Sequence, residues 1–166
     1  AVHGEGEITF KEILLGFTAK EGEPMSGARQ FPTHGAIPEK NLINLSNVVG
    51  TQIPQAVGAA LSAKIKGTSD IVIVYFGDGA SSVGDCHEGM NFASIHKLPI
   101  IFFCENNGFA ISVPLKQQMA TDSVASRAQG YGIPGITIDG NDVNLVYETT
   151  KLAALRARNG EGPTLI

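Results

Sequence analysis

Short apolar runs alternate with helical patterns along the last two thirds of the chain. The runs 71–76 and 100–104 are almost wholly apolar, which is typical of strands buried on both faces of a parallel sheet. Segments 83–96 and 142–158 are predicted helices, and the second has a capping Asn-Asp pair at its start. The remaining predictions for this part of the chain are helices over 51–66 and 121–130, a strand over 136–138 and the beginning of a strand at 164–166. This alternation predicts an α/β fold with an open, mostly parallel sheet and helices on both faces.

The first third of the chain is more irregular. Apolar residues at helical spacing predict an amphipathic helix over 8–18, and the Gly- and Pro-rich stretch 20–40 is a predicted loop. A short strand is predicted over 42–45, ending at Ser46-Asn47. Because neither a linker nor an internal repeat is visible, we expect one domain over residues 1–166. Since the sequence stops at the start of a predicted strand, we also expect it to be a fragment of a longer chain.

Composition narrows the class of protein. Of 166 residues 17% are charged and 20 are glycine, whereas an ordinary domain has roughly 25% charged residues and roughly 7% glycine. The apolar content and net charge of −4 exclude disorder and a nucleic-acid reader with a strong basic field, and the apolar runs are too short to span a membrane. Low charge in a globular chain suggests that part of the surface is covered by another molecule.

Two cysteines, Cys86 and Cys104, have no paired spacing and no accompanying histidine motif. That pattern argues against a structural zinc site and a disulfide scaffold. Both are predicted to be small buried side chains of a protein in a reducing compartment.

A candidate phosphate site follows the first buried strand, at Gly77-Asp78-Gly79-Ala80. Ligands of open parallel sheets bind beyond the carboxyl ends of the strands, and glycines let the backbone approach an anion. A carboxylate beside a phosphate repels it unless a divalent cation lies between them, and Mg²⁺ suits that position. The alternative is a simple turn, since Asp-Gly is a common turn dipeptide.

The second buried strand ends in Asn106-Asn107-Gly108. One interpretation is a β-hairpin between IIFFC and FAISV, because Asn-Gly is a strong hairpin signal. The other is that Asn107 lends its amide oxygen to the same metal as Asp78. About one strand–helix–strand crossover separates the two residues, which would bring both loops to one edge of the sheet. The helical pattern between them favours the metal site.

The pair of motifs, GDG and then NN after a helix, resembles the thiamine diphosphate signature of transketolase-like enzymes. Residues 77–114 as a whole resemble the alpha subunit of the dehydrogenase (decarboxylating) component of 2-oxo acid dehydrogenase complexes, nearest the branched-chain type. The stretches GARQFPTHGA, GTQIPQAVGAA and IDGNDVNLVYETTKLA extend the similarity over almost the whole chain. The resemblance implies a thiamine diphosphate-binding fold and oxidative decarboxylation of a 2-oxo acid, with acyl transfer to lipoyl groups. Pyruvate and acetoin enzymes, and a non-catalytic assembly subunit, remain alternatives.

The resemblance also implies site residues. Mg²⁺ would be bound by the side chains of Asp78 and Asn107 and by the carbonyl of Phe109. The amides of Gly79 and Ala80 would face the diphosphate. The cofactor-binding residues that it implies are Gly77, Asp78, Gly79, Ala80, Asn107, Asn47 and Val49.

Residues of the first third are implied in two further roles. His34, in a loop near the active-site approach of the family, is the candidate catalytic residue, with a plain loop histidine as the alternative. In some relatives Ser46, Val48, Thr51 and Gln52 would surround a monovalent cation such as K⁺, although the family often has Pro where this chain has Val48. Glu105 stands where some relatives have an arginine facing the phosphates.

Partners follow from the same resemblance. The family takes the glutamate that activates the cofactor from a beta subunit, in an alpha2-beta2 heterotetramer that serves a lipoyl-bearing acyltransferase. We expect no nucleic-acid or membrane partner. The location would be cytoplasmic in a prokaryote and the mitochondrial matrix in a eukaryote.

Overall fold

The computed structural model describes residues 8–27, 29–31, 34–43 and 47–166. The chain divides into two compact units, Ala1–Gln52 and Ile53–Ile166, which are treated separately. The predicted single domain over 1–166 stays a prediction.

The first unit contains helix α1, Phe10–Phe17, which confirms the predicted amphipathic helix. Thr9 and Glu12 form a reciprocal capping box at its start, and Lys40 lies 3.1 Å from Glu12. The backbone and hydroxyl of Thr9, followed by Lys40, lower the pKa of Glu12 to about 2. The single-turn helix η1, Pro38–Lys40, brings Ile37 and Leu42 into one antiparallel bridge.

Of the strand predicted over 42–45, only this bridge at Leu42 is seen. Leu45 and Ser46 lie outside the described residues.

The second unit is built on a parallel sheet of strand order β1-β2-β5. The strands are β1 (Val72–Gly77), β2 (Ile100–Glu105) and β5 (Thr164–Leu165). β1 and β2 run in register from Val72 beside Ile100 to Gly77 beside Glu105. The carboxyl ends of β1 and β2 therefore lie at the same edge of the sheet.

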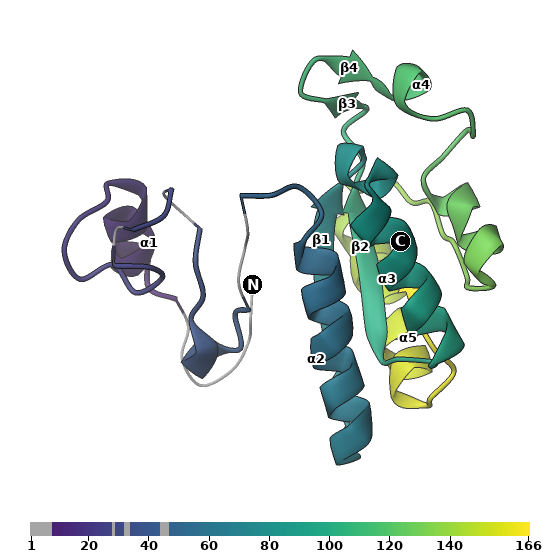
Figure 1. Cartoon of the computed structure of the whole chain (residues 1–166), viewed down its shortest axis with the longest axis horizontal. Coiled ribbons are helices and arrows are strands. Elements are labelled where there is room, and N and C mark those ends of the chain that lie inside the picture. The colour runs from purple at the N-terminus through teal and green to yellow at the C-terminus, as the bar shows by residue number, and fades with distance from the viewer. Residues whose placement is uncertain (1–7, 28, 32–33, 44–46) are drawn as a thin grey trace. The chain divides into compact units, whose positions relative to one another are not determined.

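Helices cover both faces of this sheet (Figure 1). Alternate side chains of β2 point to opposite faces. Ile100 and Phe102 enter one core with α2 (Gln52–Lys66) and α3 (Gly84–Ile95), while Ile101 packs with α5 (Val143–Arg158). The α/β class, the parallel sheet and these three helices are confirmed.

Two predicted elements differ in the structure, one in its type and one by its absence. The helix predicted over 121–130 is the 3₁₀ helix η3 (Ala125–Tyr131). Ser123 accepts hydrogen bonds from the backbone N–H and the hydroxyl of Ser126 at its start, and Gly132, in the left-handed conformation, ends it after seven residues. The strand over 136–138 is absent: Gly135 makes a single parallel bridge to Leu165 before the chain turns at Asp139.

The hairpin alternative for residues 100–113 is wrong as well. β2 is paired on both sides, with β1 and β5, and has no free edge for a third strand. The following residues form their own small hairpin, β3 (Phe109–Ala110) with β4 (Val113–Pro114), and lead into α4 (Leu115–Gln118).

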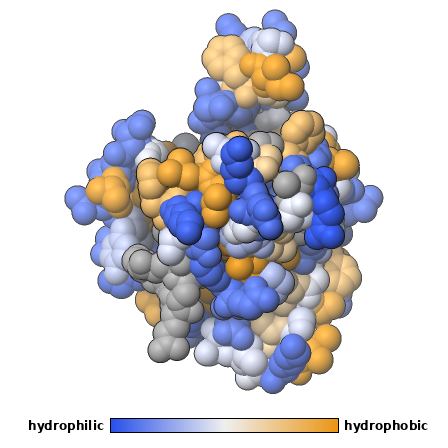
Figure 2. Space-filling model, turned by 90° about the vertical axis from the view of Figure 1, so that its left-hand side faces the viewer, coloured by the Kyte–Doolittle hydropathy of each residue, from blue (hydrophilic) through white to orange (hydrophobic). Residues whose placement is uncertain are grey.

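Apolar side chains gather at the tip of the β3–β4 hairpin, at the top of the view in Figure 2. Phe109, Ile111 and Val113 are all exposed there. In the part of the chain that the structure describes, no helix is both long and apolar enough to cross a membrane.

Candidate functional site

The loop after β1 presents a buried carboxylate at the edge of the sheet. Asp78 is only 1% exposed, and the 3₁₀ helix η2 (Gly79–Ser82) starts directly after it. The Asp78 carbonyl accepts hydrogen bonds from the backbone N–H of Ser81 at 3.1 Å and from its hydroxyl at 2.6 Å. The predicted turn at Asp-Gly is therefore real, but it holds a carboxylate out of water, which a surface turn does not do.

Gln118, on α4, is the partner of this carboxylate. Its amide Nε2 donates to Asp78 Oδ2 at 2.9 Å and to the carbonyl of Val113 at 2.9 Å. Sequence reasoning missed Gln118, because a glutamine 40 positions away carries no local signal of this contact.

Arg127, on η3, holds the other end of the loop. Its Nη1 donates to the carbonyl of Ser81 and, at 2.9 Å, to the Ser81 hydroxyl, while Nη2 donates to the Ser82 hydroxyl at 3.2 Å. Arg127 was likewise missed. It fixes the segment that follows the predicted diphosphate amides and adds a positive charge beside it.

Gly79 is required by close packing. A Cβ at this position would lie 2.8 Å from the Cβ of Ala110 on β3, which is closer than real Cβ contacts allow. The β3–β4 hairpin thus sits directly against η2, and the small residue lets the two backbones approach.

Asn107 follows β2 at the same edge. The structure brings its loop beside that of Asp78, because Gly77 and Glu105 are partners in the β1–β2 register. Its side-chain oxygen accepts a hydrogen bond from the N–H of Phe109 at 3.0 Å, and the residue is exposed. An amide oxygen has a second lone pair, so this bond leaves it able to bind a cation.

The carbonyl of Phe109 also suits the predicted role. Phe109 pairs with Pro114 in the hairpin, and proline has no N–H to donate, so this carbonyl takes no ladder hydrogen bond from its partner. Asp78, Asn107 and Phe109 together offer oxygen atoms only, which is the donor set that Mg²⁺ prefers. Nowhere in the described ranges, this edge included, do three His, Cys, Asp or Glu side chains gather to hold a metal.

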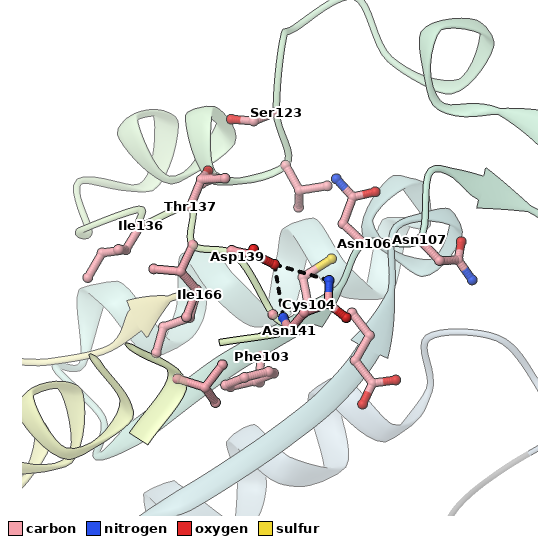
Figure 3. A pocket seen from close by; sticks show the side chains of 16 residues that line it. Phe103, Cys104, Asn106, Asn107, Ser123, Ile136, Thr137, Asp139, Asn141 and Ile166 are labelled. Atoms are coloured by element: carbon pink, nitrogen blue, oxygen red, sulfur yellow. Dashed lines mark hydrogen bonds between the residues drawn. The ribbon is translucent and has the colours of Figure 1, made fainter. Parts of the chain in front are cut away.

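A cavity of about 650 Å³ opens beside this edge (Figure 3). Cys104 and Glu105 of β2 and Asn106 line it, with Asp139 and Asn141 opposite. Asp139 Oδ1 accepts hydrogen bonds from the backbone N–H and the side chain of Asn141, which lower the pKa of Asp139. Burial, then the nearby Asp78 carboxylate, raises the pKa of the Cys104 thiol to about 12, so this cysteine is a neutral lining group rather than a nucleophile.

The remaining predicted site residues belong to the first unit. Asn47 donates from Nδ2 to Gln30 at 3.1 Å, Val49 is exposed, and His34 packs edge-on against the ring of Phe31. Ser46 lies outside the described residues, while Val48 and Thr51 are joined by a hydrogen bond from the Thr51 hydroxyl to the Val48 carbonyl. The roles of His34, Asn47 and Val49, and the K⁺ site, stay predictions.

Residues 3–166 match the sequence model of the "Dehydrogenase E1 component" protein family. The chain is 48% identical over 159 residues to the 2-oxoisovalerate dehydrogenase subunit alpha of Bacillus subtilis, covering 96% of this chain and 48% of that protein. It is 51% identical over 138 residues to the mitochondrial 2-oxoisovalerate dehydrogenase subunit alpha of Homo sapiens, covering 83% of this chain and 31% of that protein. The chain thus spans about half, or less, of the length of these relatives.

A solved structure shows a similar fold. It is the X-ray structure of "a putative thiamin diphosphate-dependent enzyme" from Mycobacterium smegmatis. The two chains are 30% identical in sequence and superpose with a TM-score of 0.55, and the match covers 75% of this chain and 22% of the other.

Proposed function

The chain belongs to the dehydrogenase E1 component family, and on that premise we propose that it is the cofactor-binding part of the alpha subunit of a branched-chain 2-oxo acid dehydrogenase. Both relatives described above carry the name 2-oxoisovalerate dehydrogenase subunit alpha, at 48% and 51% identity. Since the chain spans only part of their length, the reaction is proposed for the whole protein that contains it. That reaction is oxidative decarboxylation of the 2-oxo acid with acyl transfer to lipoyl groups.

The observation that carries the proposal is the buried Asp78 carboxylate at the carboxyl end of β1, beside the Asn107 loop. Asp78, Asn107 and the Phe109 carbonyl would hold Mg²⁺, and the amides of Gly79 and Ala80 would face the diphosphate. When bound, thiamine diphosphate supplies the electron sink for decarboxylation. This chain's own residues would bind and orient the cofactor: the buried Asp78 carboxylate would bind the cation, and Arg127 holds the loop behind it.

The other participants are part of the same proposal. A beta subunit would supply the glutamate that activates the cofactor, and an acyltransferase would carry the lipoyl groups. His34 would approach the substrate, and Asn47 and Val49 the pyrimidine ring. The protein would act in the cytoplasm of a prokaryote or in the mitochondrial matrix of a eukaryote.

Cofactor binding is tested with the full-length protein assembled with its beta subunit. Asp78→Ala and Asn107→Ala should each weaken Mg²⁺-dependent binding of thiamine diphosphate by about 100-fold or more, because each removes a proposed metal ligand. Loss of a residue that only hydrogen-bonds to a metal ligand typically lowers metal affinity by roughly 10- to 100-fold, and loss of the ligand itself should cost more. Isothermal titration calorimetry at fixed Mg²⁺ measures the affinity. Asp70→Ala, at an exposed aspartate just before β1 and so at the opposite end of this strand from Asp78, is the matched control. Unchanged affinity in both site variants would falsify the site.

Substrate choice is tested separately in the same assembly. We expect kcat/KM for 2-oxoisovalerate to exceed that for pyruvate and acetoin. A higher value for pyruvate or acetoin would replace the branched-chain assignment. Normal assembly and cofactor binding without turnover of any of the three would instead indicate a non-catalytic subunit.

A further inference from the structure

Gln118 joins two elements at the proposed metal site through one amide group. Its Nε2 reaches Asp78 Oδ2 and the Val113 carbonyl, both at 2.9 Å. Both partners are acceptors, so it is the NH₂ group and not the amide oxygen that faces them. The orientation of this side chain is therefore determined by chemistry.

The amide oxygen of Gln118 is left buried. Oε1 has no hydrogen-bond partner among the described residues, and it lies 4.0 Å from the point where a Cβ on Gly79 would be. A buried oxygen without a donor costs about 1–3 kcal/mol in a folded protein unless something supplies the hydrogen bond. Hydrated Mg²⁺, which usually keeps several waters, would bring O–H donors to the Gly79 loop.

The contact also constrains Asp78. With Oδ2 tied to Gln118, rotation of the carboxylate is restricted, although the residue sits at the end of a strand in a loop. Outer partners that fix a metal-binding side chain in this way are typically worth roughly 10- to 100-fold in metal affinity.

We propose that Gln118 is a positioning residue for the metal: it orients the Asp78 carboxylate through Nε2, and its Oε1 accepts a hydrogen bond from water bound to the cation. The proposal rests on the proposed function, since it requires the Mg²⁺ site at Asp78. Through the Val113 carbonyl, Gln118 also ties the β3–β4 hairpin, which carries Phe109, to the loop after β1.

The experiment compares two neighbouring glutamines in the full-length protein with its beta subunit. Gln118→Met keeps the size of the side chain and removes its donor and acceptor, and Gln117→Met makes the same change at an exposed position on α4. We expect the Mg²⁺ dissociation constant, titrated with thiamine diphosphate present, to rise roughly 10- to 100-fold in Gln118→Met and to stay unchanged in Gln117→Met.

The second measurement is thermal unfolding without metal or cofactor: loss of the contacts to Asp78 and Val113 should lower the unfolding temperature of Gln118→Met, so Mg²⁺ is titrated well below that temperature, where a purely structural role would leave the Mg²⁺ dissociation constant unchanged. An unchanged Mg²⁺ dissociation constant in Gln118→Met overturns the proposal, whatever its unfolding temperature. If this variant does not fold, Gln118→Asn serves in its place: it stays polar and neutral but is one methylene shorter, so its amide cannot reach Asp78 and the same loss of Mg²⁺ affinity is expected.

Asp78→Asn separates this inference from the proposed function. If wild type binds Mg²⁺ and Asp78→Asn does not, while Gln118→Met binds like wild type, only the role of Gln118 is wrong. If wild type itself shows no Mg²⁺-dependent binding of thiamine diphosphate, the proposed function fails and the role of Gln118 fails with it.

Discussion

Single residues from two distant segments hold the loop after β1. Gln118 fixes its first residue, Asp78, and Arg127 fixes Ser81 and Ser82. The three residues between Gly77 and Ser81 thus gain a defined shape without a long helix or a bound ligand. A loop arranged in advance loses less conformational entropy when it binds an anion.

Replacing Arg127 should loosen this loop. Arg127→Met removes charge-assisted hydrogen bonds to Ser81 and Ser82, each worth about 1.5–3 kcal/mol when one partner is charged. We expect the free energy of unfolding to fall by an amount of that order, as measured by urea denaturation. Arg158→Met, at an exposed arginine with one long hydrogen bond to Ser69, should change it little. Equal effects of the two substitutions would contradict the role of Arg127.

The two thiols give a prediction about pH. Burial raises the pKa of Cys86 to about 11, and burial with the Asp78 charge raises that of Cys104 to about 12, from an ordinary value of 9.0. Between pH 9 and these values the unfolded chain loses thiol protons that the folded chain keeps. The two neutral thiols therefore stabilise the folded state fully below pH 9, and this contribution is lost as pH rises through 11 and 12. Over that range the free energy of unfolding should fall by up to about 1.4 kcal/mol per pH unit for each thiol.

Urea denaturation at pH 7.5, 9 and 10 measures this slope, in parallel with the Cys86→Ala/Cys104→Ala double variant. We expect the wild type to lose more stability than the double variant over this range. Parallel curves for the two proteins would show that the thiols do not cause the loss.

Sequence could predict that the loops of Asp78 and Asn107 lie together, because each residue comes just after a buried parallel strand and the strand ends meet at one edge. It could not predict Gln118 and Arg127, whose partners lie 40 and 46 positions away. Their contacts depend on how the β3–β4 hairpin and η3 fold back over the edge of the sheet. That path is decided by packing and has no local periodicity.

Among the elements, long periodic segments were predictable and short ones were not. α2, α3 and α5 have enough turns for an apolar stripe to show, and β1 and β2 are continuous apolar runs. Segments 121–130 and 136–138 are decided by single residues, such as Ser123 and Gly132, and by whether a neighbouring strand is free to pair.

The packing of α2 against α3 predicts opposite effects for two helical glycines. A Cβ on Gly89 of α3 would lie 2.9 Å from Cγ2 of the buried Ile53, whereas one on Gly58 of α2 would meet nothing within 4 Å. Gly89→Ala should therefore destabilise by about 1–3 kcal/mol through overpacking. Gly58→Ala should stabilise by about 0.5–1 kcal/mol through lower backbone entropy in the unfolded state.

Chemical denaturation of both glycine variants checks the difference in sign. A neutral or stabilising Gly89→Ala would mean that the two helices can separate slightly at no cost. In that case, close packing would not explain the glycine.

The whole molecule combines a low charge content with many exposed apolar side chains. Charged residues make up only 17% of the chain. On α5 alone Val143, Tyr147, Leu152 and Leu155 are exposed, although Ala153 and Ala157 already fill its buried side. A helix that is apolar on its buried side and also exposes apolar side chains on its outer side is expected where a second polypeptide packs against it.

Leu152, 65% exposed, tests whether α5 meets the proposed beta subunit. If it does, Leu152→Glu would place an unpaired carboxylate in an apolar contact, and the dissociation constant of the two subunits should rise at least about tenfold. Asn144→Glu adds the same charge at an exposed position in the first turn of α5, where the helix dipole favours it, and should leave assembly unchanged. Analytical ultracentrifugation of the mixed subunits measures both. If Leu152→Glu assembles like Asn144→Glu, the covering of α5 must come from elsewhere in the full-length chain, and the beta subunit must bind another surface.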